Sequence, residues 1–126
     1  MIPMDLRYTT DHEWVRVEGD TATIGITTFA ADQLGDVVFV ELPEVGRAFE
    51  RHATFGVVES VKAVSDLFAP VAGEVTGSNR ELAVSPELVN SDPYGAGWMI
   101  SVRIADQGQL EELLDADAYE RLVAAG

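Results

Sequence analysis

The chain has no cysteine and a single lysine among its 126 residues. Without cysteine, disulfides and thiolate metal sites are excluded, which fits a reducing compartment. The other cations are seven arginines, so eight positive charges stand against 22 carboxylates and give a net charge of −14. Such a charge opposes contact with phosphate backbones and anionic lipid, and it favours basic partner surfaces. We therefore expect neither nucleic acid nor a membrane as a partner.

Long apolar runs are also missing. No segment reaches membrane-spanning length, and residues 1–7 carry no basic region followed by an apolar one. We therefore expect an unexported protein of a bacterial cytoplasm, although a processed mitochondrial protein has the same features. The length indicates one domain over residues 1–126, large enough to bury a core.

Catalytic signatures are absent from the sequence as well. It has no seryl nucleophile elbow, no phosphate-binding loop and no dense cluster of histidine or carboxylate residues at metal-ligand spacing. His12 is expected to be a hydrogen-bonded structural histidine, and His52 has no nucleophile pattern near it. These absences predict a protein with neither catalytic turnover nor a metal site of its own.

Short segments of alternating apolar and polar residues indicate a mainly β protein. Residues 12–16 and 21–27 form a predicted hairpin around Gly19 and Asp20, and residues 98–104 form a late strand. Many short strands separated by turns favour a compact β sandwich or barrel.

Short helices are predicted at the edges of this β structure. Thr27 or Thr28 can cap a first helix, which Gly35 ends in the left-handed conformation. Pro86 suits the first turn of a second helix. Near the C-terminus the apolar spacing becomes helical, which predicts two amphipathic helices over about residues 107–124.

Two segments are rich in β-branched and aromatic residues, and each predicts one strand. They are residues 36–42 and residues 53–64. No glycine, asparagine or aspartate stands beside Lys62, so local propensity alone predicts that the second strand continues past the lysine without a turn. Four aromatic side chains are assigned to core or loop packing, and the last of them is also the candidate for a partner surface: Trp14, Trp98, Phe39 and Tyr94.

Lys62 is the only side chain with a primary amine. A lysine amine can be acylated, which removes its charge and extends its reach, and arginine cannot take this role. The residues around it form the motif Glu59-Ser60-Val61-Lys62-Ala63, followed by Ser65-Asp66, Pro70 and Gly73-Glu74-Val75. Further motifs lie before and after it: His12-Glu13-Trp14-Val15, Ile24-Gly25-Ile26-Thr27, Leu34-Gly35-Asp36-Val37-Val38-Phe39-Val40-Glu41-Leu42-Pro43, Pro86-Glu87-Leu88-Val89-Asn90, Asp92-Pro93-Tyr94-Gly95 and Gly97-Trp98-Met99-Ile100.

These motifs run in order over nearly the whole chain and resemble the glycine cleavage system H-protein family. The resemblance implies a barrel-sandwich hybrid of the lipoyl/biotinyl type, mainly β, with short flanking and C-terminal helices. It places a hairpin over about residues 55–71, with strands near residues 55–60 and 65–71. Lys62 then stands at the tip of a tight turn, expected to be of type I, where it carries covalently attached lipoate as lipoyllysine.

The family's function is implied in the same way. Its members are lipoyl carriers of the glycine cleavage system, in glycine catabolism and one-carbon metabolism. The P protein, a pyridoxal-phosphate glycine decarboxylase, supplies the aminomethyl group of glycine, and the T protein, an aminomethyltransferase, passes the one-carbon unit to tetrahydrofolate. The L protein, dihydrolipoamide dehydrogenase, takes the electrons. A lipoate ligase or an octanoyl/lipoyl transferase attaches the arm, and the carrier itself is not an enzyme.

Three carboxylates acquire candidate roles from the resemblance. Glu59 is assigned to recognition by the lipoate-attaching enzyme. Asp66 and Glu13 are assigned to a cleft that holds the loaded arm, where a carboxylate can bind the cationic amine by a charge-assisted hydrogen bond. Two alternatives stay open: a structural role beside Trp14 for Glu13, and a role in solubility and turn geometry for Glu59 and Asp66. Asp11 departs from the family, which often has a small hydroxyl residue there, so the local charge differs.

Alternatives to this interpretation differ in class. A biotinyl domain is disfavoured, because Val61 and Ala63 replace the methionines that usually flank a biotinylated lysine. A lipoyl domain of a 2-oxoacid dehydrogenase usually belongs to a longer chain with linkers and lacks C-terminal helices. A lipoyl relay, which donates the group to other lipoylated enzymes, and an unmodified scaffold with a solvated surface lysine both stay open.

Overall fold

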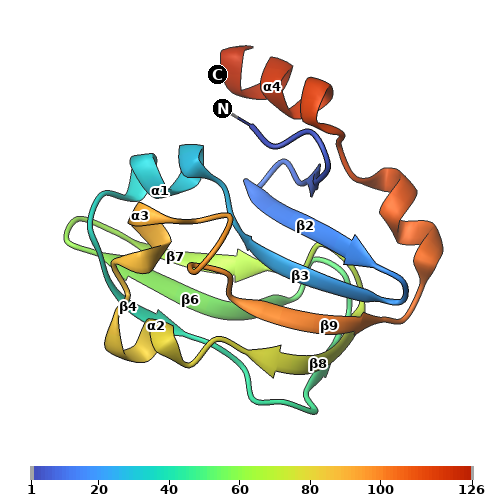
Figure 1. Ribbon diagram of the computed structural model, residues 1–126, viewed down its shortest axis with the longest axis horizontal. Helices are drawn as coiled ribbons and strands as arrows, with labels where there is room; N and C mark the ends of the chain where they lie inside the picture. The colour runs from blue at the N-terminus through green and yellow to red at the C-terminus, as the bar shows by residue number, and fades with distance from the viewer. Residues whose placement is uncertain (1, 126) are drawn as a thin grey trace.

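The computed structural model describes residues 2–125, which form two antiparallel sheets with short helices around them (Figure 1). The larger sheet has six strands in the order β1-β2-β3-β9-β8-β5, and the smaller has three in the order β4-β6-β7. The strands are β1 Arg7–Tyr8, β2 Glu13–Glu18, β3 Thr21–Ile26, β4 Val37–Glu41, β5 Ala48–Phe49, β6 Thr54–Ser60, β7 Val64–Phe68, β8 Gly73–Ser78 and β9 Ile100–Ile104.

Helical segments lie between and after the strands. They are α1 Thr28–Leu34, α2 Glu81–Val84, α3 Leu88–Ser91, the 3-10 helix η1 Gln107–Glu112 and α4 Ala116–Ala125. The predicted fold class is therefore confirmed as mainly β with short flanking helices. Within residues 2–125, no helix combines the length and apolarity needed to cross a bilayer.

The first predicted hairpin is confirmed. β2 and β3 pair from Glu13 opposite Ile26 to Glu18 opposite Thr21. Between them Gly19 adopts a φ of 65°, which glycine tolerates because it has no Cβ.

The cap of α1 also matches its prediction. The Thr27 hydroxyl accepts a hydrogen bond from the Ala30 amide at 3.2 Å. Gly35 ends the helix, but its φ of 80° and ψ of −160° lie outside the left-handed helical region. That combination is open essentially to glycine alone, so the predicted residue is right and the predicted conformation is wrong.

Other sequence predictions need correction. The first C-terminal helix is a 3-10 helix, and only α4 is an α-helix, with Asp115 accepting a hydrogen bond from the Ala118 amide at 2.8 Å. The late strand begins at Ile100 rather than at residue 98. Strands β1 and β5 were not predicted, since each has two residues and is too short for alternation to reveal.

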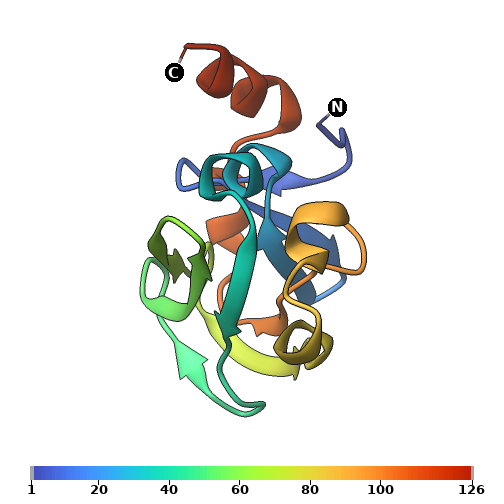
Figure 2. The same cartoon turned by 90° about the vertical axis from the view of Figure 1, so that its left-hand side faces the viewer.

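Two apolar clusters hold these layers together. The larger lies between the sheets and includes Val40, Val58 and Leu67 from the smaller one. The second joins α4 to the N-terminal strands, where Tyr8 and Tyr119 stack with ring centroids 4.6 Å apart. Figure 2 accordingly shows α4 outside the sheets, on the same side of the molecule as the N-terminal segment.

Candidate functional site

Lys62 is exposed in the turn that joins β6 to β7, at one end of the smaller sheet (Figure 1). Glu59 opposite Val64 is the last strand pair before the turn. The Ser60 amide donates to the Ala63 carbonyl at 2.8 Å, and the Ala63 amide donates to the Ser60 hydroxyl at 3.1 Å. A serine hydroxyl therefore closes a turn that has no glycine, a role of serine that sequence reasoning missed.

The lysine turn is attached to the loop between α1 and β4. The Val61 amide donates to the Asp36 carbonyl at 3.0 Å. Asn90, at the end of α3, holds the same loop on both sides, since its amide nitrogen donates to the Gly35 carbonyl and its oxygen accepts from the Val37 amide, both at 2.9 Å. This positioning role of Asn90 was not predicted.

A cleft of about 360 Å³ lies between α1 and the β6–β7 hairpin. Of the three candidate carboxylates, Glu13 and Asp66 line it and Glu59 does not. Asp66 is exposed, whereas Glu13 is 2 % exposed. The other lining residues are mostly apolar, with four polar ones among them: Ile26, Phe29, Ala30, Leu34, Val58 and Leu67, with Asp11, His12, Gln33 and Ser65.

Glu13 is the most perturbed acid of the site. Burial raises its pKa to about 7, although hydrogen bonds to its carboxyl group oppose that shift. The Thr9 hydroxyl donates to Oε1 at 2.6 Å, and the Phe68 amide donates to Oε2 at 3.3 Å. Glu13 can therefore be either a carboxylate or an acid near neutral pH. Thr9 was not predicted as its partner, although a hydroxyl four residues before the acid is visible in the sequence.

His12 lies beside Glu13 with a φ of 69°. Its Nδ1 is 2.8 Å from the Tyr119 hydroxyl, which is in turn 2.7 Å from the Thr27 hydroxyl. Burial lowers the pKa of His12 and favours a neutral ring. The expected structural histidine is thus found, and it connects the cleft to α4.

Among the aromatic residues, Trp14 and Tyr94 pack as predicted and Phe39 does not. Trp14 is fully buried, and its indole N–H donates to the Pro93 carbonyl at 2.9 Å. Tyr94 packs on Trp14, and its hydroxyl accepts a hydrogen bond from the Thr28 amide at 3.2 Å. These contacts give Tyr94 a packing role. Phe39 is 49 % exposed, and its assignment to packing was wrong. Neither sheet covers its ring, because it follows a bulge in β4 and faces outward.

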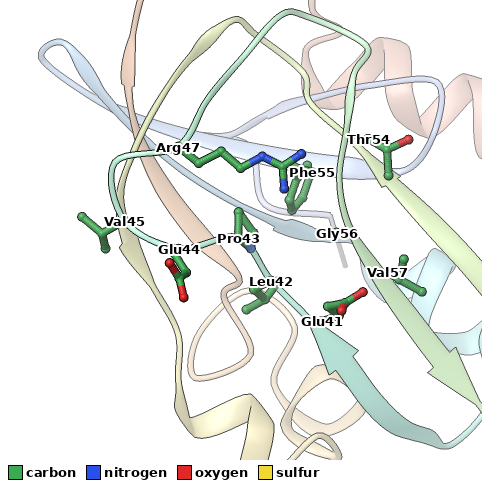
Figure 3. A pocket seen from close by; sticks show the side chains of 10 residues that line it. All are labelled: Glu41, Leu42, Pro43, Glu44, Val45, Arg47, Thr54, Phe55, Gly56 and Val57. Atoms are coloured by element: carbon green, nitrogen blue, oxygen red, sulfur yellow. The ribbon is translucent and has the colours of Figure 1, made fainter.

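A larger hollow, of about 680 Å³, lies at the opposite end of β6 from Lys62 (Figure 3). Its walls are Thr54 to Val57 of β6 and the segment from Glu41 to Val45, and Arg47 extends over it. None of the candidate site residues lines it. Over residues 2–125, no group of three or more histidine, aspartate or glutamate side chains is placed to hold a metal ion.

Comparisons with known proteins agree with this geometry. Residues 6–125 match the model of the family described as glycine cleavage H-protein. The glycine cleavage system H protein of Symbiobacterium thermophilum is 54 % identical over 125 residues, which cover 99 % of this chain and 98 % of that one. That of Magnetococcus marinus is 61 % identical over 118 residues, covering 94 % and 84 %.

A solved structure has the same fold. The crystal structure of a glycine cleavage system H protein from Mycobacterium marinum superimposes with a TM-score of 0.90 at 42 % identity, over 98 % of this chain and 99 % of that one. Fold, sequence and the exposed lysine hairpin beside its cleft thus agree. The chain belongs to the glycine cleavage H-protein family.

Proposed function

We propose that this chain is a lipoylated carrier of the glycine cleavage system. It receives the aminomethyl group of glycine from the P protein, delivers it to the T protein and passes electrons to the L protein. The observation that carries this proposal is the exposure of the only lysine at the tip of a hairpin, beside an acidic and apolar cleft, in a chain of this family. Residues 1–126 act as one carrier domain in this proposal.

The residues present fit covalently attached lipoate. The Lys62 amine is open to a modifying enzyme, and the cleft next to its turn has apolar walls such as Phe29 and Leu34 for an aliphatic arm. When attached, lipoate supplies the disulfide that accepts both the carried group and the electrons. A protein without cysteine can serve this redox chemistry for that reason.

Each candidate residue then has a separate task. Lys62 forms the amide to the arm, and Glu59 contributes to recognition by the attaching ligase or transferase. Asp66 and Glu13 hold the cationic amine of the loaded arm in the cleft, Asp66 from an exposed position and Glu13 from a buried one. A cation beside Glu13 stabilises its carboxylate and offsets the cost of burial, so the ion pair forms in a site that excludes water.

The carrier has no catalytic role of its own in this proposal. The cleft contains acids and a neutral histidine, but no nucleophile and base arranged to act together. Turnover therefore belongs to the partner enzymes, and this chain contributes attachment, positioning and shelter from water.

The first test is the intact mass of the chain after incubation with lipoate, ATP and a lipoate ligase. We expect the mass of one lipoyl group on the parent and none on Lys62→Arg, since arginine has no acylable amine. The modified parent is then combined with P protein, and glycine-dependent carbon dioxide exchange is measured. Full lipoylation without exchange would contradict a role in glycine cleavage and would favour the lipoyl relay.

The cleft is tested on the loaded carrier, by the rate at which formaldehyde and ammonia escape into solution. We expect faster release from Glu13→Gln and from Asp66→Asn, because each loses a charge that holds the amine. Asp32→Asn is the matched control, since Asp32 is exposed on α1 outside the cleft lining. If both cleft variants release these products at the parent's rate, Glu13 and Asp66 do not hold the cationic amine.

A further inference from the structure

The outer face of the three-stranded sheet carries two rows of side chains that cross all three strands. Residues directly opposite each other in an antiparallel pair project from the same side of the sheet. The strand register therefore gives one row next to the lysine turn and a second row beyond it. The rows are Phe39–Glu59–Val64 and Glu41–Val57–Asp66.

Among residues 2–125, no layer covers this face. On β4 and β6 the residues between these rows, Val40 and Val58, point inward and are buried in the core. On the outside, Phe39 is 49 % exposed and Val64 is 67 % exposed. Two more exposed apolar residues adjoin the first row, namely Val61 in the lysine turn at 69 % and Val38 in the bulge of β4 at 54 %. Exposed apolar side chains that gather in this way mark an interaction surface.

The charge of the face is of one sign. Its rows contain three carboxylates, those of Glu41, Glu59 and Asp66, and no cation. Neither of the two ion pairs found within residues 2–125 involves any of them. The complementary surface therefore carries arginine or lysine side chains set among apolar ones.

One end of this face adjoins the lysine turn, and the other end adjoins the larger hollow of about 680 Å³. Glu41 and Val57, from the second row, stand at one edge of the hollow in Figure 3, and Arg47 reaches over it from the other side. A partner that covers both rows thus has the lysine turn at one end of its footprint and can place a side chain in the hollow at the other.

We propose that this outer face is the docking surface for the enzyme that acylates Lys62, and that Phe39 is one of its principal contacts. The inference rests on the proposed carrier function. It adds residues of β4, more than twenty positions before the lysine, to the recognition that sequence reasoning confined to Glu59.

The short reach of the unmodified lysine is the reason for assigning this face to the acylating enzyme. Before the arm is attached, an enzyme must bring its reactive acyl group to the end of a lysine side chain, so it has to contact the residues immediately around the turn. The partners of the finished carrier are reached through a long arm and place no such demand. The row of Phe39, Glu59 and Val64 lies directly beside the turn, and none of the three lines the cleft, which leaves this row free for the first encounter.

The test compares initial rates of lipoylation, measured by intact mass on the unmodified protein at low carrier concentration. We expect Phe39→Thr to lower kcat/KM about tenfold, mainly through KM, because losing an aromatic contact at an interface costs about 1.4 kcal/mol, which corresponds to tenfold. Val17→Thr is the control, since Val17 is a similarly exposed apolar residue on β2 of the other sheet, and its rate should equal the parent's. Equal melting temperatures establish that both variants fold.

A charge variant tests the same face independently. Glu41→Gln should lower the lipoylation rate and weaken its decrease with added NaCl, because it removes one attraction to a basic partner. Lipoylation of Phe39→Thr and Glu41→Gln at the parent's rate would overturn the proposal.

The pre-lipoylated variants separate this inference from the carrier function. Lipoylated Phe39→Thr should support glycine-dependent carbon dioxide exchange like the lipoylated parent. If its exchange falls while its lipoylation is normal, the face serves the glycine-cleaving enzymes and the assignment to the acylating enzyme is wrong. Failure of the lipoylated parent in exchange would instead overturn the proposed function and leave the lipoylation result standing.

Discussion

Glu13 is an acid whose ionisation is set by its surroundings. The residue is 2 % exposed, and burial raises its pKa from 4.5 to about 7. In the unfolded chain the same group releases its proton near the ordinary value. Between these two values the folded protein binds more protons than the unfolded one, so the free energy of unfolding falls as the pH rises. Below this window both states are protonated and the cost of burying the charge disappears.

We predict that Glu13→Gln abolishes this dependence. Relative to the parent, the variant should gain roughly 3 kcal/mol in free energy of unfolding as the pH rises from about 4.5 to about 7, and the difference should stay constant above that. Urea unfolding at several pH values measures it. Glu18→Gln, an exposed position on the same strand, is the control and should run parallel to the parent. A parallel course for Glu13→Gln as well would mean that Glu13 ionises normally in the folded protein.

The same carboxyl group links stability to the proposed work of the cleft. A carboxylate that is costly to bury gains most from a cationic ligand, because the ligand replaces the missing solvation. Asp66 lines the same cleft from an exposed position, where water can solvate its carboxylate, so a cationic ligand replaces less solvation there. Loading of the arm should therefore stabilise the folded protein more at pH 7 through Glu13 than through Asp66.

At the scale of elements, the lysine turn depends on a contact that is distant in sequence. The Asn90 side chain of α3 is hydrogen-bonded to both the Gly35 carbonyl and the Val37 amide. In the same loop, the Asp36 carbonyl accepts a hydrogen bond from the Val61 amide of the lysine turn. The turn is therefore held from the side by a chain of hydrogen bonds as well as by its own strands. The Lys62 stem also lies over Gly35, where an added Cβ would stand 3.4 Å from Lys62 Cε.

We predict that Asn90→Ala destabilises the protein by about 1–3 kcal/mol, because it leaves two partly buried backbone groups without their partner. The amides of Val61 and Ala63 should exchange with solvent faster than in the parent, as measured by hydrogen–deuterium exchange. Ser91→Ala, at the neighbouring exposed position of α3, is the control. Unchanged exchange in the turn would show that β6 and β7 hold it without help from the loop.

The elements also show what local sequence can and cannot predict. Alternation identified β2 and β3, and a threonine followed by a glycine located α1. The lysine turn escaped local reasoning because a serine hydroxyl closes it in place of a glycine, and only the family resemblance located it. Asn90 escaped because its partners are more than fifty residues away.

The outward face of β4 was hidden for a different reason. Residues 37–40 are Val-Val-Phe-Val, so apolar residues stand on both sides of the strand and alternation cannot distinguish the buried side. The bulge between Val37 and Phe39 then shifts the pairing by one residue, which decides that Phe39 faces outward and Val40 inward.

At the scale of the whole molecule, helix α4 packs on the N-terminal strands next to the cleft. Tyr119 of α4 stacks on Tyr8 and places its hydroxyl between His12 and Thr27. His12 lines the cleft, and Thr27 caps α1, another wall of the cleft. The C-terminal helix therefore supports the cleft through one hydroxyl group without lining it.

We predict that Tyr119→Phe lowers the free energy of unfolding by about 1–3 kcal/mol, since the half-buried His12 Nδ1 loses its partner and the buried Thr27 hydroxyl loses one of its two. The Tyr119 hydroxyl forms the hydrogen bond between α4 and His12. The imidazole NMR signals of His12 should therefore also shift when it is removed. Tyr8→Phe is the matched control. It removes a hydroxyl from the same aromatic stack, but that hydroxyl donates to the nearby Pro3 carbonyl, so the protein should lose stability while the His12 signals stay in place. Equal shifts of the His12 signals in both variants would mean that the packing of the stack, and not the hydrogen bond, connects the C-terminal helix to the cleft.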